Sequence, residues 1–340
     1  MSQLLYEGNS CAPIRCKQYS FDVNQQAHSL TAWEQKYDQH SAGQFYGYLD
    51  EIQLPGLHLF EEYTSHAVQQ ECCLKPNAVW IGFSMGSSRP KVNGLHAAAH
   101  QLMIRPAQQQ FELVTPADFH IFGIVIDHDL LLNQLPSSDS AQWERATLIG
   151  NDQPEYGCWS LIRLIRDVLN SQSMFGQKLL EQGGAQGHLQ AMLRQAVLER
   201  LGAFQASAER EPRSHHSRRQ ALQRLYKYIK QSGDYPLSIS QMCTIACVSQ
   251  RTLQYCFEQE LGVSPVSFVR DGRLNAVRRV LLAQSEACAI SDVALSFGFY
   301  HLGTFNYYYK RLFGETPSQT RERAERYQSA AVVKPWGMTV

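Results

Sequence analysis

Residues 289–319 carry the clearest pattern of hydrophobic and polar positions in the chain. Apolar side chains recur at helical spacing in AISDVALSF, the pattern breaks at Gly298, and a second amphipathic segment follows in HLGTFNYYYKRLFG. The pattern predicts a helix, a tight turn around Gly298, and a second helix that ends at Gly314 with Pro317 beyond it. Two short helices joined in this way form a helix-turn-helix unit.

A looser copy of this pattern lies about fifty residues upstream, in SISQMCTIACVSQRTLQYCFEQELG. Ser238 or Ser240 can cap the first helix of this copy, and residues 247–249 make the turn, so that Ser249 caps the second helix. Apolar positions at i, i+4 and i+8 predict the core-facing stripe of the second helix, which consists of Leu253, Phe257 and Leu261. The chain is therefore expected to contain two helix-turn-helix units in tandem.

The segment between the units, SPVSFVRDGRLNAVRRVLLAQ, predicts a basic helix with Pro265 in its first turn. About 20 residues at ~1.5 Å each span roughly 30 Å, which approaches the ~34 Å between successive major-groove faces on one side of DNA. One chain can then place two helices in successive major grooves. The arginines of this helix are candidates either for phosphate contacts or for pairing with nearby acids: Arg270, Arg273, Arg278 and Arg279.

The outer face of the second helix in each unit carries the candidate base readers. In the first unit this face holds Arg251, Gln254 and Tyr255, and Arg can read guanine while Gln can read adenine. In the second unit the corresponding face carries a glycine and three longer side chains, namely Gly303, Asn306, Tyr307 and Lys310.

The charge distribution agrees with a polyanionic partner at the C-terminal end. The 340 residues have a net charge of zero, but residues 212–340 carry +8 and residues 1–211 carry −8. Nine cysteines without a C-x-x-C pair argue against zinc ribbons and a disulfide framework. The sequence shows neither a long apolar run nor a secretory start, so a cytoplasmic protein without a membrane partner is expected.

The N-terminal part has a different pattern. Short apolar runs separated by Gly, Pro and Asn fill residues 21–127, which predicts the many strands of a β-sandwich or barrel. Helical periodicity follows at 155–170 and 188–206. We expect an effector-sensing and dimerisation domain at 1–206, a linker at 207–217, a DNA-binding domain at 218–328 and a tail at 329–340.

From Arg219 to Arg323 the chain resembles the C-terminal domain of the AraC/XylS family of bacterial transcription regulators. The resemblance rests on SQRTLQYCFEQELGVSPVSFVRDGRLNAVRRVLL and ISDVALSFGFYHLGTFNYYYKRLFGETPSQTR. It implies an α+β multidomain protein with an N-terminal cupin-like β-barrel with helices and a C-terminal all-α tandem helix-turn-helix domain. It also implies an activator that binds promoter DNA, contacts RNA polymerase, senses a small molecule and forms a homodimer.

The resemblance also assigns expected roles to residues. The base contacts implied by motif position are Arg251, Gln254, Tyr255, Thr304, Asn306 and Tyr307. The phosphate contacts expected from the motif and from the basic positions are Ser249, His301, Arg278, Arg279 and Lys310. Because relatives often carry Arg at the position of Tyr307 and a polar side chain at that of Gly303, we expect the second unit to act mainly as a backbone anchor.

The effector and the alternatives stay open at this point. Five aromatic residues are candidates for an effector pocket: Trp80, Phe83, Phe111, Phe119 and Phe122. A weak local similarity to regulators of amine catabolism suggests a small amine or an amino-acid-like metabolite. The alternatives are an enzyme domain fused to a DNA-binding domain and a ligand-independent repressor. The absence of an H-x-H pair, and a G-x-S-x-G match in GFSMG without a following helix, favour no metal, no cofactor and no enzyme activity.

Overall fold

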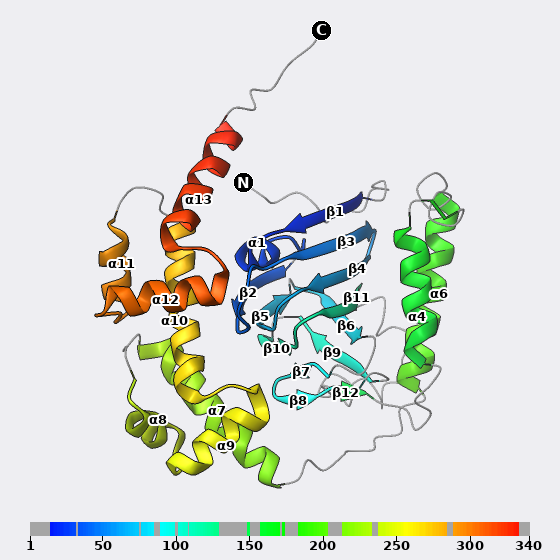
Figure 1. Ribbon diagram of the computed structural model, residues 1–340. Coiled ribbons are helices and arrows are strands. Elements are labelled where there is room, and N and C mark those ends of the chain that lie inside the picture. Colours follow the sequence, from blue (N-terminus) through cyan, green and yellow to red (C-terminus); the bar gives the residue numbers. More distant parts are fainter. Residues whose placement is uncertain are drawn as a thin grey trace. The chain divides into compact units, whose positions relative to one another are not determined.

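The chain folds into two compact units (Figure 1). The computed structural model describes residues 14–31, 33–74, 76–84, 89–98, 101–107, 109–128, 148–149, 157–170, 172–173, 183–202, 213–232, 237–283 and 288–332. Unit 1 comprises residues 1–37 and 46–207, and unit 2 comprises residues 38–45 and 208–340.

Unit 1 is built on two sheets, and their strands lie largely where the short apolar runs of residues 21–127 predict them. The seven-stranded sheet has the strand order β1 (Ile14–Ser20), β3 (Gly47–Leu54), β4 (Leu57–Thr64), β11 (Phe119–Asp127), β6 (Ala78–Ser84), β9 (Leu102–Pro106) and β12 (Leu148–Ile149). The five-stranded sheet has the order β2 (Trp33–Gln39), β5 (Val68–Leu74), β10 (Phe111–Thr115), β7 (Lys91–Val92) and β8 (Leu95–His96). A short helix, α1 (Val23–Ala27), is capped by the side chain of Asp22.

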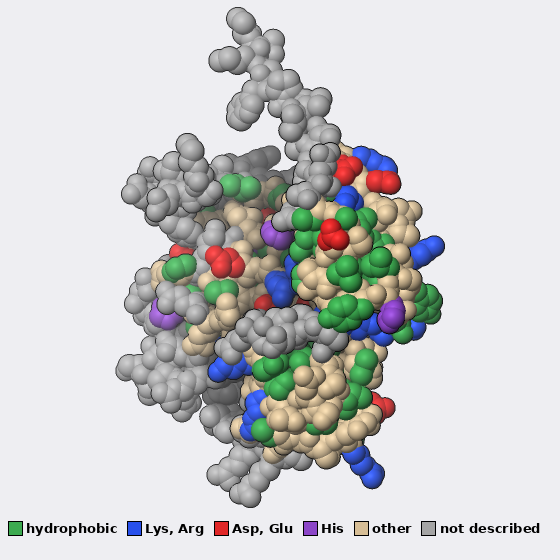
Figure 2. Space-filling model, turned by 90° about the vertical axis from the view of Figure 1, so that its left-hand side faces the viewer, with side chains coloured by type: hydrophobic (Ala, Val, Ile, Leu, Met, Phe, Trp, Pro, Cys, Tyr) green, Lys and Arg blue, Asp and Glu red, His purple; other side chains and the backbone are tan. Residues whose placement is uncertain are grey.

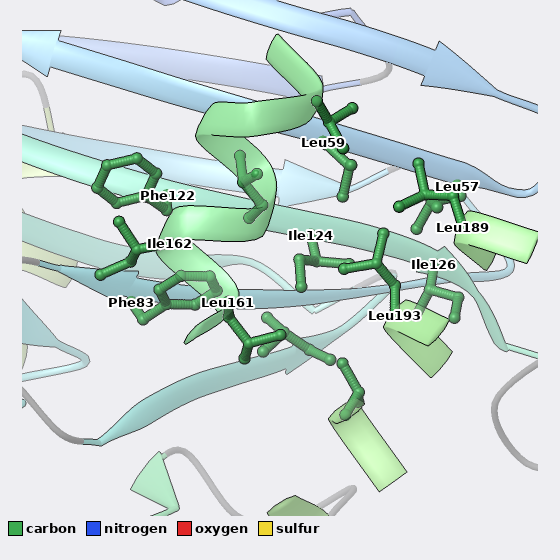
Figure 3. Packing of buried hydrophobic residues seen from close by; sticks show 14 of the residues in the cluster. Leu57, Leu59, Phe83, Phe122, Ile124, Ile126, Leu161, Ile162, Leu189 and Leu193 are labelled. Carbon is green, nitrogen blue, oxygen red and sulfur yellow. The ribbon is translucent and has the colours of Figure 1, made fainter. Parts of the chain in front are cut away.

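Alternation along the strands of the larger sheet separates two cores. Positions such as Phe83, Phe122 and Ile124 pack against the helices α4 (Gly157–Leu169) and α6 (Gly183–Gly202), as Figure 3 shows. The intervening positions, such as Trp80 and Phe60, face the smaller sheet. The prediction of a β-rich N-terminal domain with helices is confirmed.

Outside residues 38–45, the regular elements in the described part of unit 2 are all helices. Its helices are α7 (Arg213–Ser232), α8 (Ile239–Ala246), α9 (Gln250–Leu261), α10 (Pro265–Ala283), α11 (Ile290–Ser296), α12 (Leu302–Phe313) and α13 (Pro317–Val332). The predicted tandem helix-turn-helix domain is confirmed by these helices. Helix α7 begins inside the segment 207–217 for which a linker is expected, and residues 203–212 lie outside the described residues.

Helix α10 belongs to the cores of both helix-turn-helix units. Its first turns place Phe268 and Val269 in a cluster with α7, α8 and α9. Its later turns place Leu274 and Val277 in a second cluster with α11 and α12. Because one continuous helix supplies side chains to both cores, it fixes the position of the first helix-turn-helix unit relative to the second.

Residues 38–45 complete unit 2, although Asp38 and Gln39 are the last two residues of strand β2. The buried amide of Asn275 pairs with both backbone groups of Gln39, accepting from its N–H at 3.0 Å and donating to its carbonyl at 2.9 Å. The side chain of Gln39 donates to the carbonyl of Leu312 at 2.8 Å. The His40 ring stacks on Phe268 with a centroid distance of 4.8 Å. This segment therefore ties α10 to the end of α12.

Candidate nucleic-acid interface

Local capping signals position the recognition helix of the first unit. Helix α8 starts with a capping box between Ser238 and Gln241 and ends at Cys247, whose backbone is left-handed with φ of 56°. Helix α9 starts at Ser249, whose hydroxyl accepts a hydrogen bond from the Thr252 N–H at 3.2 Å. Leu253 and Phe257 are fully buried, so the opposite face of α9 is left exposed.

The second unit repeats this arrangement with different caps. Gly298 has φ of 73° in the turn after α11, as its sequence position predicts. His301 precedes α12 without making a side-chain cap hydrogen bond, and Gly314 ends the helix with φ of 72°. Ala289, rather than the neighbouring Ser291, occupies the N-cap position of α11.

The two recognition helices correspond residue by residue. Both have 12 residues, and adding 52 to a residue number in α9 gives its equivalent in α12. The predicted base readers lie at exposed positions of these helices: Arg251, Gln254, Tyr255, Thr304, Asn306 and Tyr307. Each helix therefore presents its candidate readers on the face opposite its own buried stripe.

The candidate phosphate contacts divide into two groups. Ser249, His301 and Lys310 are exposed and remain candidates. Arg278 is buried, its guanidinium donates to Glu315 Oε1 at 2.7 Å, and it lies over the Phe313 ring at 4.4 Å. These contacts favour a structural role for Arg278 over the predicted phosphate contact.

The other arginines of α10 also have partners within unit 2. Arg279 pairs with Asp38, Arg270 pairs with Asp271 at 2.9 Å, and Arg273 donates to the carbonyl of Phe297 at 2.7 Å. Burial raises the pKa of the Asp271 carboxyl, and the Arg270 charge opposes that shift. The sequence indicates that Arg278 is buried, because Arg278 lies four residues after Leu274 and beside Val277 on the core-facing stripe of α10.

The second unit exposes large apolar side chains, and two of them, Tyr300 and Leu302, were not among the predicted readers. Tyr300 is 66% exposed, Leu302 is 40% exposed, and the predicted reader Tyr307 is 60% exposed. Figure 2 views the side of unit 2 that carries α8 and α11 in Figure 1, and shows hydrophobic side chains gathered at the surface. An alignment of the two units could have singled out Leu302, because it occupies the first position of α12, where the first unit has the polar Gln250.

The structure does not bring the five pocket candidates together. Phe83 and Phe122 stack on each other with centroids 6.1 Å apart, in the core beneath α4 and α6. Trp80, Phe111 and Phe119 lie in the other core, between the two sheets. The period of two along a strand separates these groups, because neighbouring positions face opposite sides of a sheet.

The core between the sheets combines rings with polar groups. Trp33, which the sequence interpretation did not single out, makes edge contacts with Phe60, Trp80 and Phe111 at centroid distances of 6.2, 5.8 and 6.1 Å. Among the described residues, the indole N–H groups of Trp33 and Trp80 have no hydrogen-bond partner. A Cβ at Gly82 or Gly123 would overlap the Trp80 or the Phe60 ring, so both glycines are needed for this packing.

Buried acids lie in the same interior. Burial raises the pKa of the Glu62 carboxyl to about 7, while hydrogen bonds from Gln26 and Tyr37 oppose the shift. Glu51 pairs with His58 at 2.8 Å. Within the described part of the chain, no group of three or more His, Cys, Asp and Glu side chains is arranged to hold a metal ion. No helix in that part is long and apolar enough to cross a membrane.

These features define the C-terminal unit as a tandem helix-turn-helix DNA-binding domain. Comparison with known proteins identifies its type. Residues 242–323 match the family model described as a helix-turn-helix domain. The chain is 34% identical over 100 residues to the XylDLEGF operon transcriptional activator 2 of Pseudomonas putida, which covers 29% of this chain and 64% of that protein. It is 29% identical over 142 residues to another XylDLEGF operon transcriptional activator of Pseudomonas putida, which covers 42% of this chain and 43% of that protein.

A solved structure described as a probable AraC family transcriptional regulator from Rhodopseudomonas palustris is 31% identical. It covers 31% of this chain and 96% of that chain, with a TM-score of 0.29. The chain spans between about two fifths and two thirds of the length of the curated relatives above. The C-terminal domain of this chain resembles those of AraC/XylS-family transcription regulators, and the two curated relatives above are named as transcriptional activators.

Proposed function

We propose that the protein is a transcription activator that responds to a small molecule and binds promoter DNA through both helix-turn-helix units. The observation that carries this proposal is the pair of equivalent, exposed recognition helices mounted on one shared helix. Helix α10 has 19 residues, so it is about 28 Å long. That length suits the ~34 Å spacing of successive major grooves.

The base-reading role is tested by substitutions in α9. Arg251→Ala and Gln254→Ala are each expected to weaken binding to a selected site by about 1–3 kcal/mol and to relax the base preference at one position. Both residues are exposed, so the fold should be retained. Arg326→Ala is a charge-matched control, because Arg326 lies on α13 and pairs loosely with Glu322 at 3.6 Å. Equal losses on selected and random duplexes would contradict base reading.

The backbone-anchoring role is tested by salt dependence. Lys310→Ala should weaken binding to all duplexes alike and reduce the slope of log K against log salt concentration by about one unit. Lys310 is exposed on α12 beyond the candidate readers. An unchanged slope in Lys310→Ala would remove it from the set of phosphate contacts.

The effector is proposed to bind between the sheets of unit 1. Aromatic rings can hold a cationic group there, and the buried acids Glu51 and Glu62 complement an ammonium group. The indole N–H groups of Trp33 and Trp80 can donate to a carboxylate oxygen. These groups support a small amine or an amino-acid-like metabolite as the effector class.

A thermal-shift screen of amines and amino acids against the full chain tests the sensor role. A ligand that binds between the sheets should raise the melting temperature and change tryptophan fluorescence. Trp80→Phe keeps a ring in the core and removes the indole N–H. It should therefore lower the free energy of ligand binding by more than it lowers the free energy of unfolding of unit 1. A ligand-independent regulator would show no shift with any compound, and an enzyme would turn a compound over.

Activation and self-association complete the proposal. The relatives named as activators support activation through RNA polymerase, which transcription from a selected promoter with purified polymerase would test. The helices α4 and α6 are proposed to form a homodimer interface, and Met192 on α6 is 46% exposed. Met192→Glu should then lower the apparent mass in sedimentation without unfolding the chain.

A further inference from the structure

The first two exposed positions of the second recognition helix lack a hydrogen-bonding side chain, whereas those of the first carry one. The first two positions of α9 are Gln250 and Arg251, and both are exposed. The equivalent positions of α12 are Leu302 and Gly303, and both are exposed as well. Replacement of two hydrogen-bonding side chains by Leu and Gly removes the capacity to read base-edge donors and acceptors at these positions.

Gly303 widens this apolar surface. A Cβ at Gly303 would meet nothing within 4 Å, so packing does not require a glycine there. The Tyr307 ring, four residues later, makes an edge contact with the Tyr308 ring at a centroid distance of 5.2 Å and leaves the space beside Gly303 open. Leu302 directly precedes Gly303 in the sequence, and Tyr300, which is 66% exposed, lies three residues before Gly303.

The charge of α12 identifies DNA as the molecule that covers this surface. Helix α12 contains Lys310 and Arg311 and no acidic residue, whereas α9 contains Glu258 and Glu260. A helix with cationic and no acidic side chains favours a polyanion, and promoter DNA is the polyanion that the proposed function supplies. The apolar surface also occupies the place where α9 carries its base readers, which is the part of a recognition helix that enters the major groove.

We propose that the second unit reads thymine through its 5-methyl groups, using an apolar surface formed by Tyr300, Leu302 and Tyr307. In the major groove the thymine methyl is the one apolar mark on a base edge, and it is read by apolar contact. The second unit is then a specific reader of T-containing steps as well as a backbone anchor. This inference rests on the proposed function, because it requires that the chain binds DNA through both units.

The test uses the full chain and a duplex obtained by selection from random sequences. The half-site of the second unit consists of the positions whose enrichment changes in a selection repeated with Tyr307→Ala. Each thymine in that half-site is replaced by deoxyuridine, which removes only the methyl group. Each contacted thymine should cost about fourfold in Kd, the factor expected for one buried methyl-sized group. The same replacement in the half-site of the first unit should cost less than twofold.

Two variants link the methyl to the apolar surface. Leu302→Ala should reduce the difference between thymine and deoxyuridine, because it removes most of the apolar contact at an exposed helical position. Leu302→Gln installs the side chain of the equivalent first-unit position and should shift the selected base away from thymine. Circular dichroism of both variants should match that of the unchanged protein.

The outcomes separate this inference from the proposed function. A selected site without thymine in the second half, or equal Kd values for thymine and deoxyuridine with intact specific binding, would overturn the methyl readout alone. Failure to bind any duplex specifically would overturn the proposed function and this inference with it. Unchanged binding in both Leu302 variants would also overturn it, and would make the apolar surface a site for another partner.

Discussion

The two helix-turn-helix units share a backbone plan and differ in what they bury and display. Their recognition helices have the same length, and each ends at a left-handed glycine, Gly262 or Gly314. The buried side of α9 begins with Leu253 and Phe257, whereas that of α12 has aromatic side chains at Phe305, Tyr309 and Phe313 and an aliphatic one at Leu312. The comparison shows that spacing and caps preserve the scaffold, while the exposed positions are free to change the surface that meets DNA.

The second unit is also held by a buried polar network. Arg278 donates to Glu315 at 2.7 Å and to Thr320 at 3.2 Å, and the Tyr309 hydroxyl donates to Thr320 at 2.9 Å. Arg323 adds a further contact to Glu315 at 3.0 Å. The network joins α10, α12 and α13. In the first unit, the exposed Arg224 donates a hydrogen bond to the carbonyl of Ala246 at 3.1 Å.

Removal of Arg278 is expected to have the largest effect and to break the second unit selectively. Arg278→Ala removes the buried donor to Glu315 and Thr320, and because Arg323 stays paired with Glu315, the expected loss of stability is about 3 kcal/mol. Arg224→Ala in the first unit should cost no more than about 1 kcal/mol. Urea denaturation of the full chain measures both. A smaller loss in Arg278→Ala than in Arg224→Ala would show that the network does not stabilise the second unit.

Much of both helix-turn-helix units could be predicted from the sequence, because the patterns that define them are local. A cap at Ser249, a turn at Gly298 and a stop at Gly314 each depend on the preferences of one residue. The stripes that begin at Leu253 and Phe305 follow from helical spacing alone. The exposed readers followed in turn, since Arg251 and Gln254 lie opposite a stripe that must be buried.

The remaining features depend on residues that are far apart in the sequence. The pairing of Arg279 with Asp38 joins positions 241 residues apart, and no local pattern contains that information. The pocket candidates were separated because Phe83 and Trp80 face opposite sides of one strand. Hydrophobicity alone does not tell which side of a sheet a buried ring faces when both sides are covered.

The helix ends provide a sharper comparison of the two units. Gly262 and Gly314 both have positive φ, so alanine at either position costs about 1 kcal/mol for the left-handed conformation. At Gly262 a Cβ meets nothing within 4 Å, but at Gly314 it would lie 3.0 Å from the backbone nitrogen of Gln44. Gly314→Ala should therefore lose about 2 kcal/mol or more, against about 1 for Gly262→Ala, in the same denaturation experiment. Equal losses of unfolding free energy in the two variants would show that segment 38–45 moves away from the added Cβ at no measurable cost.

The smallest expected difference concerns the two N-caps. The Ser249 hydroxyl accepts from the Thr252 N–H, so Ser249→Ala should cost about 1 kcal/mol. His301 makes no side-chain cap hydrogen bond, so His301→Ala should change the free energy of unfolding by less than about 0.5 kcal/mol. Because the fold is then unaffected, any loss of DNA affinity in His301→Ala reports its proposed phosphate contact directly. A loss of stability in His301→Ala equal to that in Ser249→Ala would contradict the assigned difference between the caps.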